Sequence, residues 1–293
     1  MNKKLLTIFM ILLIPTIFAL TYYGLVSRTV TIDPSVTFTG DNAADIGISG
    51  GESVYSEALD VVSQTSVIVP LKITTTANPD DCTVTNTNNY LLDNTGGVCG
   101  GGSTTCEKRI YIQAKDVNVD TVSDINTIEW EASVTAGYLP HIDVLIDTDD
   151  DGVADDALVF EYDKVDDGCG DGAPYPTGEL NTFGDKGSID DSSYAWLNSG
   201  QPGNCQGDPG YTVDTLLNWK LLNYKVIAFE LEVDNWILES NSNVKNVKIN
   251  GNNVEVSLKS EDSLNFKVQT DFGLLCEGDY EVSIEVTADE SRR

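Results

Sequence analysis

Short stretches of alternating apolar and polar residues, separated by Gly, Asp and Asn, run through most of this chain of 293 residues. In one stretch Phe229, Leu231 and Val233 are apolar, whereas Glu230 and Glu232 are acidic. A period of two, in stretches rich in β-branched and aromatic residues, is typical of strands with one buried face. Strands are predicted at residues 29–39, 66–76, 108–114, 127–135, 141–146, 157–162, 226–233, 244–249, 254–258, 264–270 and 280–286.

This spacing of short strands predicts an all-β protein, an antiparallel β-sandwich or jelly roll. Residues 250–253, Asn-Gly-Asn-Asn, separate two of the predicted strands and indicate a hairpin turn. One short helix is expected at residues 212–223, behind a cap at Thr212 or Asp214. Its apolar stripe consists of Val213, Leu216, Leu217, Lys220 and Leu221.

A long loop insertion is expected at about residues 165–224, because Gly, Asp, Pro and Ser crowd its first part. It contains Tyr175, Tyr194 and Trp196 close to several aspartates. Loops on a rigid scaffold often carry binding residues, so these aromatic side chains are candidates for ligand binding, for instance to a sugar. The alternative is that they pack the loop against itself.

The N-terminal residues have the pattern that predicts an export signal. Lys3 and Lys4 precede an uncharged, mostly apolar run from residue 5 to residue 26. This arrangement predicts a signal peptide or an N-terminal membrane anchor at residues 1–28, with residues 29–293 forming an extracellular domain. A run of this length can span a bilayer as a hydrophobic helix, and no A-x-A cleavage site follows it, which favours a retained anchor.

Six cysteines follow the export segment, which agrees with an oxidising compartment and predicts disulfides. No C-x-x-C pair exists and the chain has a single histidine, so zinc ribbons, haem attachment and thioredoxin chemistry lack their residues. Of the fifteen possible pairings, we favour the one that joins Cys82 to Cys99, Cys169 to Cys205 and Cys106 to Cys276.

The chain is strongly acidic, with 47 acidic and 17 basic residues and a formal net charge of −30. A phosphate backbone would be repelled, and no basic patch with interleaved aromatic residues is present. Nucleic acid is therefore excluded as a partner.

The most specific motif is Asp147-Thr-Asp149-Asp-Asp151-Gly152-Val153, in which carboxylates at every second position precede a glycine. This is the pattern of a calcium loop, in which Val153 offers its backbone carbonyl. The loop resembles those of dockerins, thrombospondin type 3 repeats and EF-hands. Position twelve is Leu158, so Asp155 or Asp156 would have to close the ligand shell.

The residues on both sides of this loop are β-rich, which predicts a strand, loop, strand arrangement and a structural calcium site. The expected ligands are thus Asp147, Asp149, Asp151, Val153 and either Asp155 or Asp156. The alternative is a solvated acidic turn.

Glu230, Glu232 and Asp234 offer a less favoured alternative, an enzyme of the jelly-roll glycoside hydrolase type. The stretch loosely resembles the E-x-D-x-E strand of laminarinase-type enzymes, but it departs from that motif at both of the last two acidic positions. An acidic, solvated outer face of a sandwich strand is the simpler interpretation. His141 is interpreted as a structural residue, and no catalytic residue is predicted.

The extended, β-branched segment at residues 28–39 is suited to donation to a neighbouring molecule's sheet, or it completes its own sheet. Export signal, sandwich and early strand together resemble the camelysin and TasA class of surface fibre subunits and their archaeal relatives. The sequence therefore predicts an exported, calcium-stabilised, non-enzymatic surface protein that self-associates or binds other surface proteins or glycans. A calcium-stapled carbohydrate-binding module is the alternative.

Overall fold

The computed structural model describes residues 36–39, 53–56, 58–63, 68–77, 83–95, 107–137, 139–161, 188–200, 213–233, 240–259, 262–273 and 282–288. All of them belong to the second of two units, Ser35–Arg293. The predicted export segment at residues 1–28, Tyr175 and all six cysteines lie outside the described residues. Within the described ranges, no helix is both long enough and apolar enough to cross a membrane.

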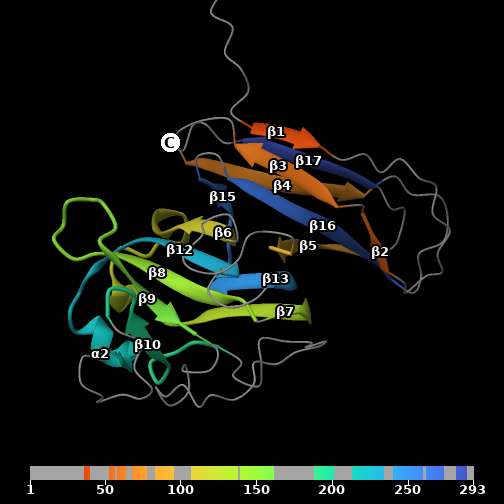
Figure 1. Ribbon diagram of the computed structural model, residues 1–293. Coiled ribbons are helices and arrows are strands. Elements are labelled where there is room, and N and C mark those ends of the chain that lie inside the picture. Colours follow the sequence, from red (N-terminus) through yellow and green to blue (C-terminus); the bar gives the residue numbers. More distant parts are fainter. Residues whose placement is uncertain are drawn as a thin grey trace, which may run out of the picture. The chain divides into compact units, whose positions relative to one another are not determined.

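Two sheets of antiparallel strands make up the fold (Figure 1), which confirms the all-β prediction. The first has the order β1-β3-β16-β5-β13-β14, with β2 paired to β16 and β7 paired to β13. Its strands are β1 (Val36–Thr39), β2 (Ser53–Tyr55), β3 (Leu59–Ser63), β5 (Val84–Asp93), β7 (Ile128–Ala136), β13 (Asn241–Ile249), β14 (Asn252–Asn253) and β16 (Ser263–Phe272).

The second sheet has the order β11-β10-β9-β8-β12-β6-β15-β4-β17. Its strands are β4 (Val69–Ala77), β6 (Lys108–Gln113), β8 (His141–Asp147), β9 (Asp156–Phe160), β10 (Tyr194–Leu197), β11 (Val213–Thr215), β12 (Lys225–Val233), β15 (Ser257–Leu258) and β17 (Val282–Ala288).

Alternation along the strands builds one apolar core that both sheets share. From the nine-stranded sheet, Ile110, Ile142 and Leu231 are completely buried, and from the eight-stranded sheet Val244 and Phe266 are completely buried. Because side chains of a strand alternate between its faces, the residues next to these lie on the outer faces of the sheets. Functional groups of the described strands must therefore be sought on those outer faces or at strand ends.

The predicted hairpin at residues 250–253 is present. Asn250 and Gly251 have φ angles of 53° and 76°, the left-handed conformation that a tight hairpin turn requires. The returning strand β14 is only two residues long. The chain then crosses to the other sheet, so the single strand predicted at 254–258 becomes β15 in a different sheet.

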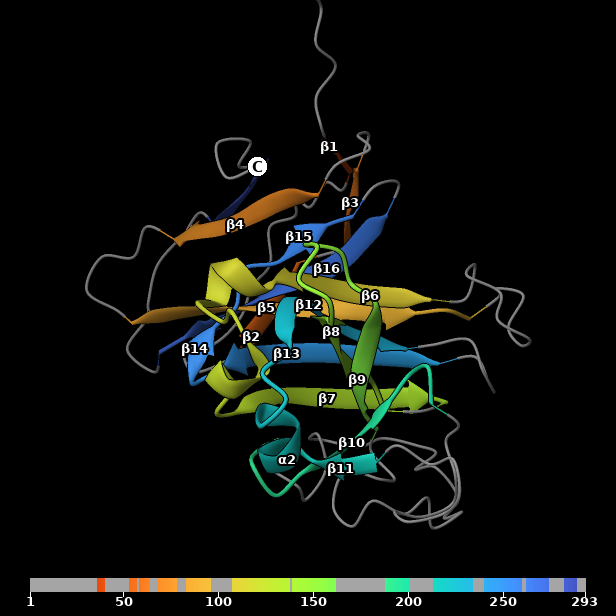
Figure 2. The same ribbon diagram turned by 90° about the vertical axis from the view of Figure 1, so that its left-hand side faces the viewer.

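Three differences from the predicted elements stand out. The strands β2, β3 and β5 were not predicted, and β10 and β11 lie inside the region expected to be a loop insertion. The predicted helix at 212–223 is reduced to α2 (Leu216–Lys220), capped by Thr215 and not by Thr212 or Asp214. Figure 2 shows α2 beside β10 and β11, where Val213–Thr215 pair with β10 and so cannot be helical.

Candidate functional site

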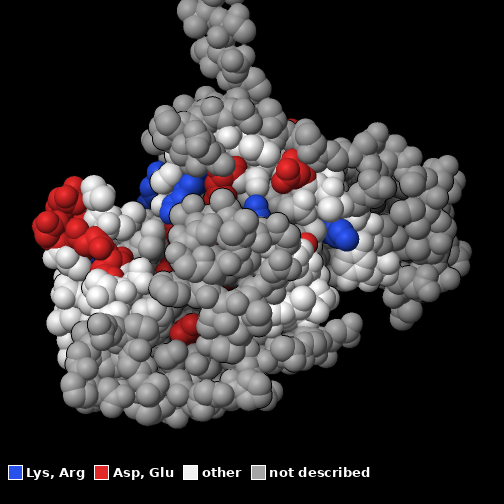
Figure 3. Space-filling model, viewed as in Figure 1, with Lys and Arg blue, Asp and Glu red and all other residues white. Residues whose placement is uncertain are grey.

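The acidic loop, defined as residues 147–156, joins β8 to β9 in an antiparallel hairpin (Figure 1). Ile146 pairs with Asp156, and the Asp155 N–H donates to the carbonyl of Ile146 at 2.9 Å, which closes the base of the loop. The loop is the red projection on the left of Figure 3. The predicted strand, loop, strand arrangement is therefore confirmed.

Asp147 organises the loop from inside. The residue as a whole is only 2% exposed. Its two carboxylate oxygens accept hydrogen bonds from the backbone N–H groups of residues 149 to 152. Desolvation acts to raise the pKa of Asp147, but these backbone donors outweigh it and hold the pKa below its usual range. The wrapping requires left-handed backbone at Asp150 and Gly152, with φ of 67° and 87°.

Three carboxylates of the loop converge. One oxygen each from Asp147, Asp149 and Asp151 lie within 4.8 Å of one another. The negative charges of Asp151 and Asp155 raise the pKa of Asp149. A carboxylate whose ionisation is opposed by its neighbours is a group that a bound cation would stabilise.

The remaining predicted ligands differ in placement. Val153 is 62% exposed, and its N–H donates to Asp151 Oδ1 at 2.8 Å. Asp155 Oδ2 accepts from the backbone N–H and the hydroxyl of Thr148, at 2.7 and 2.8 Å. Asp156 instead accepts from the backbone N–H of Ser199 at 2.9 Å and from the Ser199 hydroxyl. Of the two residues expected to complete the set of calcium ligands, only Asp155 has its carboxylate bound within the loop, because Asp156 binds Ser199 outside it.

The donor set fits a hard cation. Every candidate ligand offers oxygen, from carboxylates and from one backbone carbonyl, and neither histidine nor cysteine lies in the loop. Oxygen-only sets of this kind suit calcium, which accepts irregular coordination at about 2.3–2.6 Å. The same loop also binds a neighbouring strand, because Lys225 Nζ lies 2.6 Å from Asp150 Oδ1.

The aromatic candidates of the predicted insertion are strand residues. Tyr194 and Trp196 are half-buried in β10, and Trp196 pairs with Val159 of β9. The indole Nε1 of Trp196 is buried and makes no hydrogen bond in the part of the chain that the structure describes.

The structure corrects one prediction about charge. Glu230 and Glu232 do not form a solvated face, because they are only 5% and 7% exposed. They belong to a group of charged residues that combines the outer face of β6, β8 and β12 with residues next to β6, β15 and β16, which we call the charged cluster. Its members are Glu107, Arg109, His141, Asp143, Glu230, Glu232, Lys259 and Asp262.

Strand register brings the cluster together. Glu230 pairs with Tyr111 on one side and Asp143 on the other, and Glu232 pairs with Arg109 and His141. Arg109 Nη1 lies 2.9 Å from Glu230 Oε2. Desolvation acts to raise the pKa of Glu232, but His141 and Arg109 outweigh it and lower the pKa.

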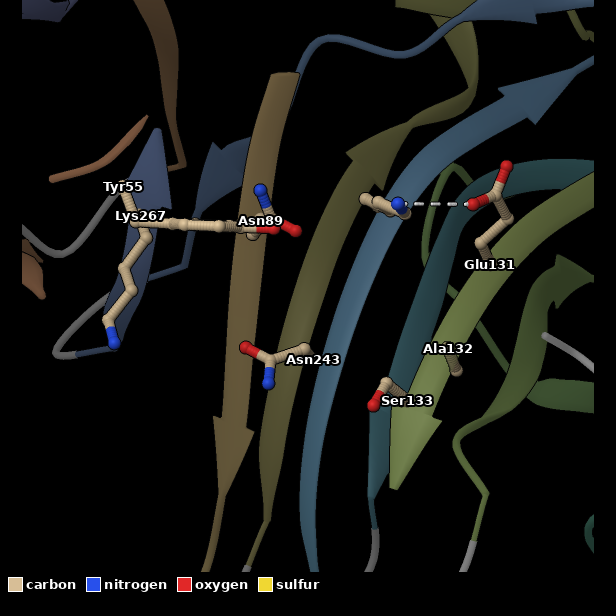
Figure 4. A pocket seen from close by; sticks show the side chains of 8 residues that line it. Tyr55, Asn89, Glu131, Ala132, Ser133, Asn243 and Lys267 are labelled. Carbon is tan, nitrogen blue, oxygen red and sulfur yellow. Dashed lines mark ion pairs between the residues drawn. The ribbon is translucent and has the colours of Figure 1, made fainter. Parts of the chain in front are cut away.

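A polar groove is the third feature, on the outer face of the eight-stranded sheet (Figure 4). It has a volume of about 330 Å³. Tyr55, Lys267, Asn89 and Asn243 lie along it, and Glu131 forms an ion pair of 3.5 Å with Lys245 at its far side. Sequence reasoning missed this groove because β2 and β5, which supply Tyr55 and Asn89, were not predicted.

No family model, no curated protein and no solved structure matches this chain.

Proposed function

We propose that this protein is an exported, non-enzymatic surface protein of structural or interaction type, whose β-sandwich is stabilised by calcium and disulfides and tethered by its N-terminal segment. The observation that carries the calcium part is the convergence of Asp147, Asp149 and Asp151 within 4.8 Å at the tip of the β8–β9 hairpin. The raised pKa of Asp149 adds to it, because calcium would relieve the repulsion that causes that shift.

The non-enzymatic part is supported by the state of the paired carboxylates. A glycosidase needs one carboxyl that is protonated before the reaction and one that is ionised. In this chain Glu230 contacts both Arg109 and Lys259, and the pKa of Glu232 is lowered. The lowered pKa makes Glu232 unsuited to act as the proton donor, and Glu230 is held by two cationic side chains.

The interaction part is supported by the sheet edges. Among the described strands, β17 ends the nine-stranded sheet and pairs only with β4, and a partner strand is proposed to add at this edge. The early strand β1 pairs with β3 of its own chain, which agrees with the simpler of the two predictions for this segment. Self-association through a sheet edge is thus proposed for β17 and not for a donated β1.

The test of this function uses the full chain in a mild detergent, without reducing agent. Sedimentation velocity with calcium and with chelator measures both compactness and association. The proposal predicts a compact particle with calcium that forms larger species as protein concentration rises. Placing a lysine at the β17 edge through Thr287→Lys should reduce these species, whereas Thr135→Lys, on the other sheet, should not. A monomer at every concentration and calcium level would contradict it.

Glycan binding is a second candidate, favoured by the polar groove. Tyr55 is 52% exposed beside the amides of Asn89 and Asn243, and an exposed aromatic ring next to amide groups is how proteins hold neutral sugars. The lining carries no apolar patch that would suit a lipid.

A glycan array with the full chain tests this candidate. Tyr55→Ala should weaken any glycan signal about tenfold, since losing one stacking contact costs about 1.4 kcal/mol. Tyr194→Ala, in the half-buried β10, serves as the control and should leave the signal unchanged. Equal losses in both variants, or no signal from the wild-type protein, would exclude the groove as a glycan site.

A further inference from the structure

His141, Asp143 and Glu232 come from two paired strands and share one face. In the antiparallel register of β8 and β12, Glu232 lies opposite His141 and Glu230 lies opposite Asp143. The residues between them, Ile142 and Leu231, point into the core. Alternation therefore directs all four polar side chains to the outer face, where they are nonetheless buried or nearly so.

The distances among these three side chains leave room for one shared ion. His141 Nε2 lies 3.6 Å from Asp143 Oδ1 and 3.5 Å from Glu232 Oε1. Ordinary hydrogen bonds of this type span about 2.7–3.2 Å. Two ligand atoms that each lie about 2.0–2.1 Å from a tetrahedral ion are about 3.4 Å apart. All three ligand atoms lie within 4.8 Å of one another.

The two glutamates of β12 differ in how their charge is compensated. Glu230 has Arg109 Nη1 at 2.9 Å and the Lys259 ammonium as partners. For Glu232, Arg109 Nη1 lies 3.8 Å from Oε2, and this oxygen is buried and accepts no hydrogen bond within the described ranges. Burying a carboxylate without close compensation is costly. The nearest arginine or lysine contact of Glu232 is therefore longer than those of Glu230.

We propose that His141 Nε2, Asp143 Oδ1 and Glu232 Oε1 bind a second metal ion, of the zinc class. One imidazole nitrogen and two carboxylate oxygens form a donor set for borderline transition ions, whereas calcium takes oxygen ligands only. The chain's single histidine is thus used at a site distinct from the acidic loop. This inference stands independently of the calcium site and of the surface function.

The test is a zinc titration of the metal-stripped, tag-free full chain, oxidised, in about 0.15 M salt with saturating calcium. Salt and calcium suppress weak binding to the general negative charge of the chain. The wild-type protein should bind one zinc ion. Cobalt in place of zinc should give the visible absorption of a tetrahedral nitrogen and oxygen site, a readout that needs no variant.

Variants assign the ligands. His141→Gln and Glu232→Gln should each lower zinc affinity by more than about 100-fold, because loss of a ligand exceeds the about 10–100-fold cost of losing a ligand's supporting partner. Glu107→Gln removes the same charge within the charged cluster but no ligand, and should retain zinc binding. The wild-type protein failing to bind zinc or cobalt would overturn the proposal, and so would equal zinc affinity in His141→Gln and Glu107→Gln.

Discussion

The acidic loop and the charged cluster collect carboxylates in opposite ways. In the loop, Asp147, Asp149 and Asp151 meet because they are two positions apart in sequence on one tight turn. In the cluster, Glu230 and Glu232 meet Arg109 and His141 because three strands pair in a certain register. The loop is largely exposed apart from Asp147, while Glu230 and Glu232 of the cluster are buried. In the loop, backbone N–H groups compensate the negative charge of Asp147. In the cluster, cationic side chains compensate the negative charge of the glutamates.

This difference implies different energetic roles. An exposed group of acids can remain hydrated without its ion, at a modest cost in repulsion. A buried carboxylate must keep its cation, because losing one partner leaves an uncompensated charge in a medium of low polarity. We therefore expect substitutions in the charged cluster to affect stability more than substitutions in the loop.

The largest effect is expected from Arg109→Met, which removes the cation that contacts Glu107, Glu230, Glu232 and Asp262. Breaking a buried ion pair from one side costs about 3–5 kcal/mol. Chemical denaturation of the full chain measures the loss. Lys245→Met, which breaks the exposed pair with Glu131, is the control and should cost under about 1 kcal/mol. Similar losses in the two variants would show that burial does not make the ion pairs of the charged cluster costlier to break than an exposed pair.

Calcium removal should have the next largest effect. Calcium at one hundred times its dissociation constant adds about 2.7 kcal/mol to stability, which corresponds to about 5–11 °C in Tm for a protein of this size. Differential scanning calorimetry with calcium and with chelator measures this shift. Asp149→Ala should abolish it and Glu230→Gln should not. A shift that survives in Asp149→Ala would place the calcium elsewhere in the chain.

Gly152→Ala should have a smaller effect. Gly152 has φ of 87°, and an added Cβ would meet nothing within 4 Å, so the cost is backbone strain alone. That strain is about 1–2 kcal/mol for alanine and less for asparagine, which adopts left-handed backbone more readily. Thermal melting in calcium should give the highest Tm for the wild-type protein, a lower Tm for Gly152→Asn and the lowest Tm for Gly152→Ala. Equal Tm values for the two variants would mean that the loop does not hold this backbone conformation.

The smallest effect is expected from Lys225→Met, which breaks the exposed contact with Asp150. Solvent screens this pair, so Tm should stay within about 2 °C of the wild type and the difference should vanish at high salt. A large loss that persists in 1 M salt would show that the loop depends on this strand contact, contrary to the view that Asp147 organises it from inside.

The two regions also differ in how far they could be predicted. The hairpin of β8 and β9 and the acidic loop follow from local spacing, so the sequence alone indicates both. The charged cluster depends on the pairing of β6, β8 and β12, which are far apart in sequence, and nothing in the alternation of residues 229–234 tells which face is covered. Interpreting Glu230 and Glu232 as solvated was wrong for that reason.

Two secondary-structure errors have similar causes. The strand β5 begins Val-Thr-Asn-Thr-Asn-Asn, a composition typical of turns, but pairing with β16 holds this part extended, and β13 pairs with the rest of the strand from Tyr90 onward. The predicted helix at 212–223 is longer than the observed α2 because not all of its apolar residues lie in a helix. Val213 pairs in β11, while the indole of Trp219 donates to the carbonyls of Ala195 and Asp214.

Equilibrium dialysis of calcium against the full chain, in about 0.15 M salt, tests the central claim most directly. The account predicts one tightly bound calcium ion per chain, lost in Asp149→Asn and in Asp151→Asn but kept in Glu230→Gln, although each substitution removes one negative charge. Calcium bound equally by all three variants, or no calcium bound by the wild-type protein, would contradict it and would leave the acidic loop as a solvated turn.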